Sequence, residues 1–226
     1  MHVNGMLGRA RRAAGRPRKG EANKRRDHLV DVASALFLEA GYHRVSLARI
    51  ASEAGVAVRT IYNAFGGKAG LFEAVLRAGR ARFIDDEEVL EPGAASIAAV
   101  LERFGLRYLR FLTDPQVVRL RRIVLSEAGT SQQLEQAFRD AGPGQTQSQL
   151  ARYFSDERVR GQIRPDVPLE LLPTYFIACI AGEYLWPGAT PVAAIGEDCL
   201  HQQLRTRLPL FLRSVLNTAP AKGLRQ

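Results

Sequence analysis

The sequence predicts an all-α protein made of a small N-terminal group of helices followed by a larger helical bundle. Apolar residues recur every three to four positions through most of the chain, which is the spacing of an amphipathic helix. No segment alternates apolar and polar residues over more than a few positions, so we expect no β-sheet. The pattern is interrupted at Pro92-Gly93, where we expect the second region to begin.

The helices are expected where apolar stripes run between breaking residues. The first stripe covers residues 23–40 and ends at Gly41. Asp114-Pro115 is a helix-start signal, and Gly142-Pro143-Gly144 ends a short helix. Together the predicted helices are 23–40, 46–54, 57–65, one starting near 68, 94–113, 114–128, 132–140, 145–160, 169–186 and 197–216. We expect a basic arm over 1–22, domains over 23–80 and 81–217, and a tail over 218–226.

The composition limits the classes of protein that fit. A chain of 226 residues with 46% hydrophobic content can bury one or two cores. The sequence has no apolar run long enough for a transmembrane helix and no signal-peptide core, so we expect a cytoplasmic protein without a membrane partner. Cys179 and Cys199 lie in apolar helical contexts, which indicates buried free thiols; a redox-sensing pair is the alternative.

The net charge of +9 is concentrated at the N-terminus. Within residues 1–26 the only acid is Glu21, and the basic side chains are Arg9, Arg11, Arg12, Arg16, Arg18, Lys19, Lys24, Arg25 and Arg26. Such an arm is attracted to phosphate in a salt-dependent manner. The segment 15–19 resembles an AT-hook core, in which Arg16 and Arg18 would enter an A·T-rich minor groove. A general phosphate-binding tail is the alternative.

Residues 41–72 contain the most informative pattern in the chain. The helix over 46–54 is followed by Gly55, which can adopt the positive φ that a sharp turn between helices needs. The next helix, 57–65, is expected to bury Val56, Ile61 and Phe65. Its outward side chains are then Val58, Arg59, Thr60, Tyr62 and Asn63. This layout is that of a helix-turn-helix domain that reads DNA.

The same stretch resembles the signature of the TetR family of bacterial transcription regulators. The matching residues are Gly41, Tyr42, Ser46, Ile50, Ala51, Ala54, Gly55, Val56, Thr60, Ile61, Tyr62, Phe65, Lys68 and Leu71. Residues 122–129 and the QAFRDAGPG that follows are similar to the AefR-like regulatory domains. The resemblance implies a dimeric, ligand-responsive regulator, most often a repressor, released from a palindromic operator by a small apolar molecule. Ala57 and Gly67 depart from the family's usual capping residues, and an alanine N-cap costs about 1 kcal/mol.

The expected DNA contacts fall into two groups. Arg59 and Asn63 can hydrogen-bond guanine and adenine edges, and Val58 can meet a thymine methyl group, although Arg59 could instead bind only phosphate. The expected phosphate ligands are Arg44, Ser46, Arg49, Thr60, Tyr62 and Lys68. Ser46 is first of all the N-cap of its helix. Arg44, Arg49 and Lys68 could also be ordinary solvated side chains.

The second domain is expected to bind the ligand and to form the dimer. The candidate pocket residues are Phe104, Tyr108, Phe111, Glu127, Tyr153, Tyr175, Phe176 and Cys179. Glu127 is expected on the same helical face as Leu120, Ile123 and Val124, so it needs a partner such as Arg103 or Arg107 unless it faces a ligand cavity. Glu183 invites the same two interpretations. The small residues Ala178, Ala181 and Gly182 suggest a homodimer formed by the last two helices.

No pattern in the sequence indicates catalysis. It lacks a phosphate-cradling glycine loop, a nucleophile elbow and a histidine pair at metal-ligand spacing, so we expect no enzyme, cofactor or metal. The main competing function is an architectural DNA-binding protein whose arm dominates and which senses no ligand. The apolar helical domain argues against that alternative, because binding DNA alone does not need it.

Overall fold

The computed structural model describes residues 19–84, 90–93, 95–127, 131–186, 188, 193 and 195–217, with side chains from residue 23 onward. Arg16, Arg18 and the predicted tail over 218–226 lie outside the described residues. Within the described ranges the structure is helical, and its one β-type pairing is an isolated bridge between Ile163 and Leu216. The predicted all-α class is therefore confirmed.

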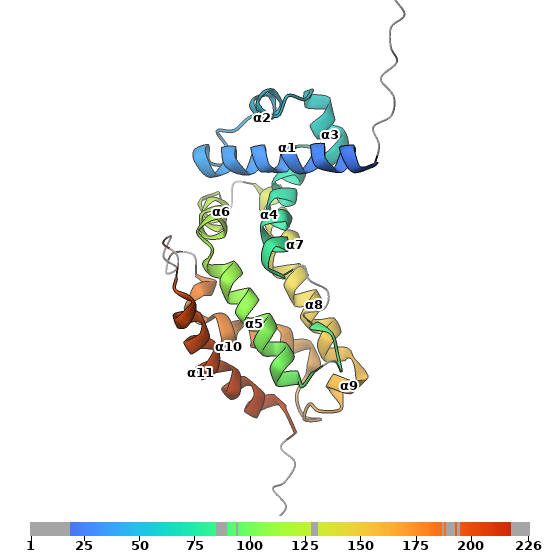
Figure 1. The fold of residues 1–226 in the computed structure, drawn as a ribbon, viewed down its shortest axis with the longest axis vertical. Coiled ribbons are helices and arrows are strands. Elements are labelled where there is room, and N and C mark those ends of the chain that lie inside the picture. The colour runs from blue at the N-terminus through green and yellow to red at the C-terminus, as the bar shows by residue number, and fades with distance from the viewer. Residues whose placement is uncertain are drawn as a thin grey trace, which may run out of the picture.

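Figure 1 shows a helical bundle with a small group of helices across one end. The helices are α1 (Lys19–Ala40), α2 (Leu47–Glu53), α3 (Val58–Phe65), α4 (Lys68–Ile84), α5 (Ile97–Thr113), α6 (Pro115–Ser126), α7 (Gln132–Ala141), α8 (Pro143–Ser155), α9 (Glu157–Arg160), α10 (Leu172–Ala181) and α11 (Glu197–Val215), with 3₁₀ turns η2 (Leu169–Leu171) and η3 (Gly182–Leu185). Helix α1 crosses the top of the view with α2 and α3 on its outer side, and α4 leads from them into the bundle.

Three predicted helices have different limits in the structure. Helix α1 begins at Lys19, within the stretch expected to be an arm. The helix predicted over 145–160 is two helices, because the side chain of Asp156 accepts a hydrogen bond from the Arg158 N–H at 3.0 Å and starts α9. The helix predicted over 169–186 loses its α-helical geometry at Gly182, whose φ of 50° lies in the left-handed region.

The first core is built on aromatic residues beneath the short helices. Phe72 of α4 packs edge-on against Phe37 of α1 and Tyr42, with ring centroids 5.1 and 5.2 Å apart. Burying each of these rings contributes about 1.5–3 kcal/mol. Leu120 and Val124 of α6 and Leu134 of α7 belong to the same core. The first domain is therefore packed directly against the second across the predicted boundary at residue 80.

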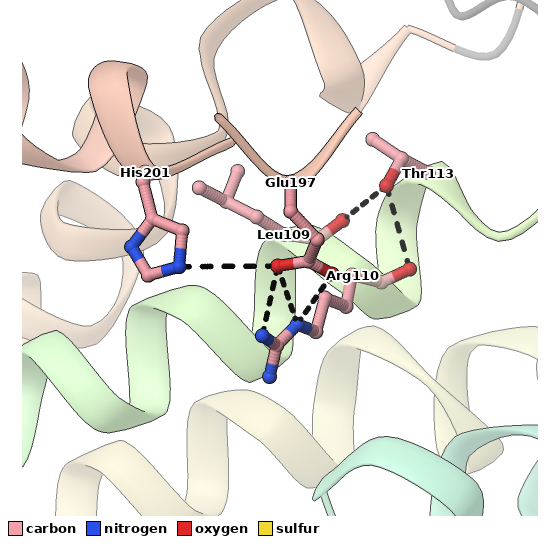
Figure 2. Close-up of polar contacts among 5 residues, drawn as sticks. All are labelled: Leu109, Arg110, Thr113, Glu197 and His201. Atoms are coloured by element: carbon pink, nitrogen blue, oxygen red, sulfur yellow. Dashed lines mark hydrogen bonds and ion pairs between the residues drawn. The ribbon is translucent and has the colours of Figure 1, made fainter. Parts of the chain in front are cut away.

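The second core lies among α5, α8, α10 and α11. It contains Phe104, Phe154, Phe176 and Phe211, all of them buried. At one end of this bundle Arg110 of α5 makes a bidentate pair with Glu197 of α11, with Nη2 2.8 Å from Oε2 and Nε 2.9 Å from Oε1 (Figure 2). The pair joins the last turn of α5 to the first turn of α11. No helix in the described ranges is both long and apolar enough to span a membrane.

Both cysteines are free thiols in the structure. Cys179 is half-buried and its sulfur lies 3.6 Å from the Arg207 carbonyl oxygen. Cys199 is exposed, which corrects the expectation that both thiols are buried, because it occupies the solvent side of the first turn of α11.

Candidate nucleic-acid interface and ligand cavity

The turn between α2 and α3 has the geometry predicted from the sequence. The Ser46 hydroxyl caps α2 by accepting a hydrogen bond from the Arg49 N–H at 3.1 Å. Gly55 adopts a φ of 64°, which allows the chain to turn sharply into α3. Ala57 precedes α3 and supplies no side-chain cap. The start of α3 therefore lacks the stabilisation that a serine or threonine would provide.

Helix α3 buries one face and presents the other to solvent. Ile61 is fully buried, and Phe65 is covered on one side by the Arg26 guanidinium, 4.9 Å from the ring centroid. The side chains expected to contact DNA are all exposed: Val58, Arg59, Thr60, Tyr62 and Asn63. We call these five residues the reading face. It has no acidic residue, and it includes two exposed apolar or aromatic groups, Val58 and Tyr62.

Exposed basic residues flank the reading face. The Arg44 Nε donates to the Ala40 carbonyl oxygen at 2.8 Å, which holds its guanidinium near the end of α1. Arg49 on α2 lies 3.5 Å from the Glu39 carboxylate, and both side chains are largely exposed. Their contacts with DNA phosphate remain a prediction.

Lys68 faces the protein in this structure. Its ammonium group donates to the His43 carbonyl oxygen at 3.2 Å and lies 4.4 Å from the centre of the Tyr42 ring. Burial lowers the pKa of Lys68, and the nearby Glu127 carboxylate partly opposes that shift. The lysine expected to bind phosphate thus sits where the first domain meets the end of α6.

A cavity of about 320 Å³ lies between α4 and the regulatory helices. It is lined by Leu76, Gly79, Tyr108, Phe111, Leu112, Val117, Leu120, Arg121, Phe138, Gly142, Pro143, Gln147, Thr174, Ile177, Ala178 and Leu185. Most of these groups are apolar, and the polar groups are few, as is usual for small-molecule sites. The cavity touches α4 directly through Leu76 and Gly79.

Of the eight candidate pocket residues, Tyr108 and Phe111 line this cavity. The other six lie elsewhere. Phe104, Tyr153 and Phe176 fill the second core, where their rings pack against other helices. Tyr175 is exposed and its hydroxyl lies 3.0 Å from the Ser214 hydroxyl, while Cys179 sits beside α11.

The two acidic residues singled out in the sequence have partners outside the cavity. Glu127 ends α6 and lies 2.7 Å from the His43 imidazole, rather than against Arg103 or Arg107, because this end of α6 reaches the first domain. Glu183 accepts a hydrogen bond from Arg207 at 2.7 Å on a largely exposed surface. Its predicted arginine partner is present, and neither carboxylate lines the cavity.

The polar residues that line the cavity, among them Arg121, Gln147 and Thr174, were not predicted from the sequence. The position of Arg121 in the helical pattern could have indicated its burial. It stands four residues after Val117 and three before Val124, so it falls on the buried face of α6. A charged residue on such a face indicates a special role, since burial of a charge is costly.

The chain combines a helix-turn-helix that has an exposed reading face with a helical bundle that has an apolar cavity. This combination is typical of DNA-binding transcription regulators. Residues 29–75 match the model of the bacterial regulatory proteins of the tetR family, and residues 99–213 match that of the AefR-like transcriptional repressor C-terminal domain. The chain belongs to the TetR family, with a regulatory domain of the AefR-like type.

Solved structures of the same family share this fold. A protein of Mesorhizobium loti assigned to the family has a TM-score of 0.70 at 21% identity, over 87% of this chain and 98% of that one. The flavonoid-responsive regulator FrrA has a TM-score of 0.68 at 26% identity, over 87% and 100%. A third structure is that of NalD of Pseudomonas aeruginosa, the secondary repressor of the MexAB-OprM multidrug efflux pump. Its TM-score is 0.61 at 22% sequence identity, and the match covers 88% of this chain and 100% of NalD. Comparison with curated proteins finds no match.

Proposed function

We propose that the protein is a homodimeric repressor that leaves a palindromic operator when a small, largely apolar molecule enters the cavity. The observation that carries this proposal is the contact between the cavity and α4. The same helix begins at Lys68, directly after the reading helix, and its middle supplies Leu76 and Gly79 to the cavity wall. A ligand that fits one position of α4 better than another would therefore bias the placement of the reading face.

Polar contacts connect α4 to α8, which forms part of the cavity wall. Arg80, which is 1% exposed, donates to the Thr146 hydroxyl at 3.4 Å and to the Gln149 side chain at 2.5 Å. Arg77 also reaches Gln145 at 3.4 Å. These contacts join α4 to α8, whose Pro143 and Gln147 line the cavity. Displacement of α8 by a ligand would be transmitted to α4 through these side chains.

The likeness to FrrA and NalD supports ligand-controlled repression. FrrA is described as responsive to flavonoids and NalD as a repressor. Both likenesses extend over the regulatory helices as well as the first domain. A regulator that binds an operator acts where the chromosome is, so we also propose a cytoplasmic location.

We propose that two copies associate through the outer faces of α10 and α11. Leu171, Tyr175 and Leu210 are 59%, 44% and 57% exposed, and Tyr175 lies against Phe211 with ring centroids 5.3 Å apart. Tyr175 lies on α10, Leu210 on α11 and Leu171 at the end of the η2 turn that leads into α10. Exposed apolar side chains gathered in this way are typical of a partner surface. Ala181 does not contribute, because it is fully buried within the protomer. A stable dimer should bury about 1,200 Å² or more. Sedimentation at micromolar concentration tests this, and a monomer would contradict it.

The function is tested by selecting bound sequences from random DNA and then titrating the operator against candidate effectors. We expect a palindrome with half-sites about one helical turn apart or somewhat more, since each reading face enters one major groove. Binding spread over A·T-rich DNA without a palindrome would instead favour an architectural protein. Linkage requires operator DNA to weaken effector binding as much as effector weakens operator binding. Equal effector affinity with and without operator would contradict induction.

A further inference from the structure

The cavity is lined by two buried polar side chains that interact with each other, Arg121 and Tyr108. They are 7% and 5% exposed, and both line the cavity. The remaining wall around them is mostly aliphatic and aromatic. Because polar groups inside an apolar cavity determine which ligands are accepted, this pair is the main candidate for specificity.

The guanidinium of Arg121 is held by backbone carbonyl groups. Nη1 donates to Tyr184 at 3.0 Å and to Leu112 at 3.4 Å, and Nη2 donates to Leu185 at 2.6 Å. These acceptors come from the end of α5 and from η3. The bonds fix the orientation of the guanidinium while leaving part of its donor set unused.

The positive charge of Arg121 has no carboxylate partner among the described residues. Its three acceptors are neutral, and none of the residues that line the cavity is acidic. Burial lowers the pKa of Arg121, and the interaction with Tyr108 partly opposes that shift. Buried charges in proteins are normally paired, because an unpaired one is costly. Among the described residues, therefore, no negative charge compensates the Arg121 cation in the cavity.

The Tyr108 hydroxyl makes no hydrogen bond with the described residues. Burial raises the pKa of Tyr108 to about 12, while the neighbouring Arg121 and Arg80 guanidinium groups lower it. The phenol is therefore neutral at physiological pH and retains its proton. It can donate one hydrogen bond to an acceptor that enters the cavity.

We propose that the effector is an apolar molecule bearing one carboxylate, which Arg121 and Tyr108 bind inside the cavity. The carboxylate supplies the missing negative charge and accepts hydrogen bonds from both side chains, while the apolar wall receives the rest of the molecule. This inference rests on the proposed function and specifies the ligand class of the same cavity. The alternative is that Arg121 only holds the ends of α5 and η3 together.

The test is calorimetric titration of the full-length protein with 2-naphthoate and with neutral 2-naphthamide. It distinguishes an Arg121 that binds a carboxylate from one that only holds α5 and η3 together. The compounds share the ring and differ in charge. We expect naphthoate to bind at least about ten-fold more tightly. Tyr108→Phe, which removes only the hydroxyl, should reduce that preference several-fold, and Arg121→Met should abolish it. Ile177→Val alters the apolar wall and should weaken both compounds alike.

The variants are compared only where circular dichroism shows native helix content. If Arg121→Met does not fold, Tyr108→Phe alone tests the proposal, because it removes one of the two predicted hydrogen-bond donors. Equal binding of both compounds by the wild type would overturn the proposal, as would a preference unchanged by Tyr108→Phe and, where that variant folds, by Arg121→Met. Binding of neither compound would also count against it. Operator release is measured in the same samples. If both compounds bind equally and release operator, the proposed function stands and the carboxylate inference falls.

Discussion

The His43 imidazole and the Glu127 carboxylate lie 2.7 Å apart and connect the DNA-binding domain to the regulatory domain. His43 lies between α1 and α2, and Glu127 caps the end of α6. Lys68, at the start of α4, donates to the His43 carbonyl oxygen at 3.2 Å. Groups from α4, the α1–α2 loop and α6 thus meet at one point, where a shift of α6 would act on the DNA-binding domain.

Glu127→Gln keeps the size of the side chain and removes its charge. We expect effector binding to be retained. The effector should, however, weaken operator binding less than it does in the wild type, by a factor of up to about five. The factor is small because a partly exposed ion pair contributes about 1 kcal/mol or less. Fluorescence anisotropy on labelled operator measures the ratio. Glu197→Gln, which breaks a pair within the regulatory domain, is the control. An unchanged ratio would show that the His43–Glu127 pair does not take part in coupling.

The same substitution should lower the pKa of Lys68 further. Burial already lowers this pKa, and the Glu127 carboxylate opposes the shift by favouring the charged ammonium. Removing the carboxylate removes that opposition. NMR titration of the lysine side chain, with Lys68→Arg used for assignment, measures the change. A pKa that stays constant or rises would mean that Glu127 does not influence the ammonium in solution.

Arg59→Ala tests whether the reading face recognises sequence. Arg59 is exposed on α3. If it binds a guanine edge, its loss should cost about 1–3 kcal/mol and relax the preference at one base pair. Arg49→Ala is the matched control, because loss of a phosphate contact weakens all sequences alike and reduces the salt slope by about 1. An unchanged ranking of single-base operator variants in Arg59→Ala would exclude base reading by Arg59.

The pair between Arg110 and Glu197 predicts a pH-dependent contribution to stability. The hydrogen bond from Arg110 lowers the pKa of Glu197, so the stabilisation is present above the unfolded-state pKa of a glutamate and is lost as pH falls through the lower folded-state pKa. Because the Glu197 side chain is 57% exposed, the effect should be below about 1 kcal/mol. Thermal melts of wild type and Glu197→Gln should differ slightly at pH 7 and converge in acid. A difference that persists in acid would contradict this origin.

Local signals explain which parts of the fold could be predicted. Ser46 and Gly55 determine the limits of α2 by a cap and a positive φ, both of which depend on residues next to the turn. The break at Gly182 could not be predicted in the same way. The apolar run continues through it, and the reason for glycine is its φ of 50°, which a residue with a Cβ rarely adopts. The Arg207 guanidinium of α11 also occupies the space beside it, but a flexible side chain can move away.

The cavity was less predictable than the reading face for a related reason. The reading face belongs to one short helix, so helical periodicity alone separates Ile61 from its exposed neighbours. The cavity is bounded by several helices, and whether an aromatic residue lines it or fills a core depends on their packing. Phe104 and Tyr108 share a face of α5 and stack 6.2 Å apart, yet only Tyr108 reaches the cavity.

The basic arm should contribute affinity rather than sequence preference. Since α1 begins at Lys19, deletion of residues 1–18 removes Arg9, Arg11, Arg12, Arg16 and Arg18 and leaves the helix whole. Each phosphate that these residues neutralise adds about 0.9 to the salt slope. We expect the truncated protein to bind more weakly, with a shallower salt dependence and the same preferred palindrome.

The arm is either an AT-hook-like minor-groove binder or a general phosphate-binding tail. To separate these interpretations, the full-length and truncated proteins are titrated across a salt series on operators with A·T-rich and with G·C-rich flanks. If Arg16 and Arg18 enter a narrow minor groove, deletion should cost more affinity on A·T-rich flanks, where the groove is more electronegative. An equal loss on both flanks, with a changed slope, would identify a general phosphate-binding tail. An unchanged slope would mean that these five arginines make no contact with DNA phosphate, and it would contradict both interpretations of the arm.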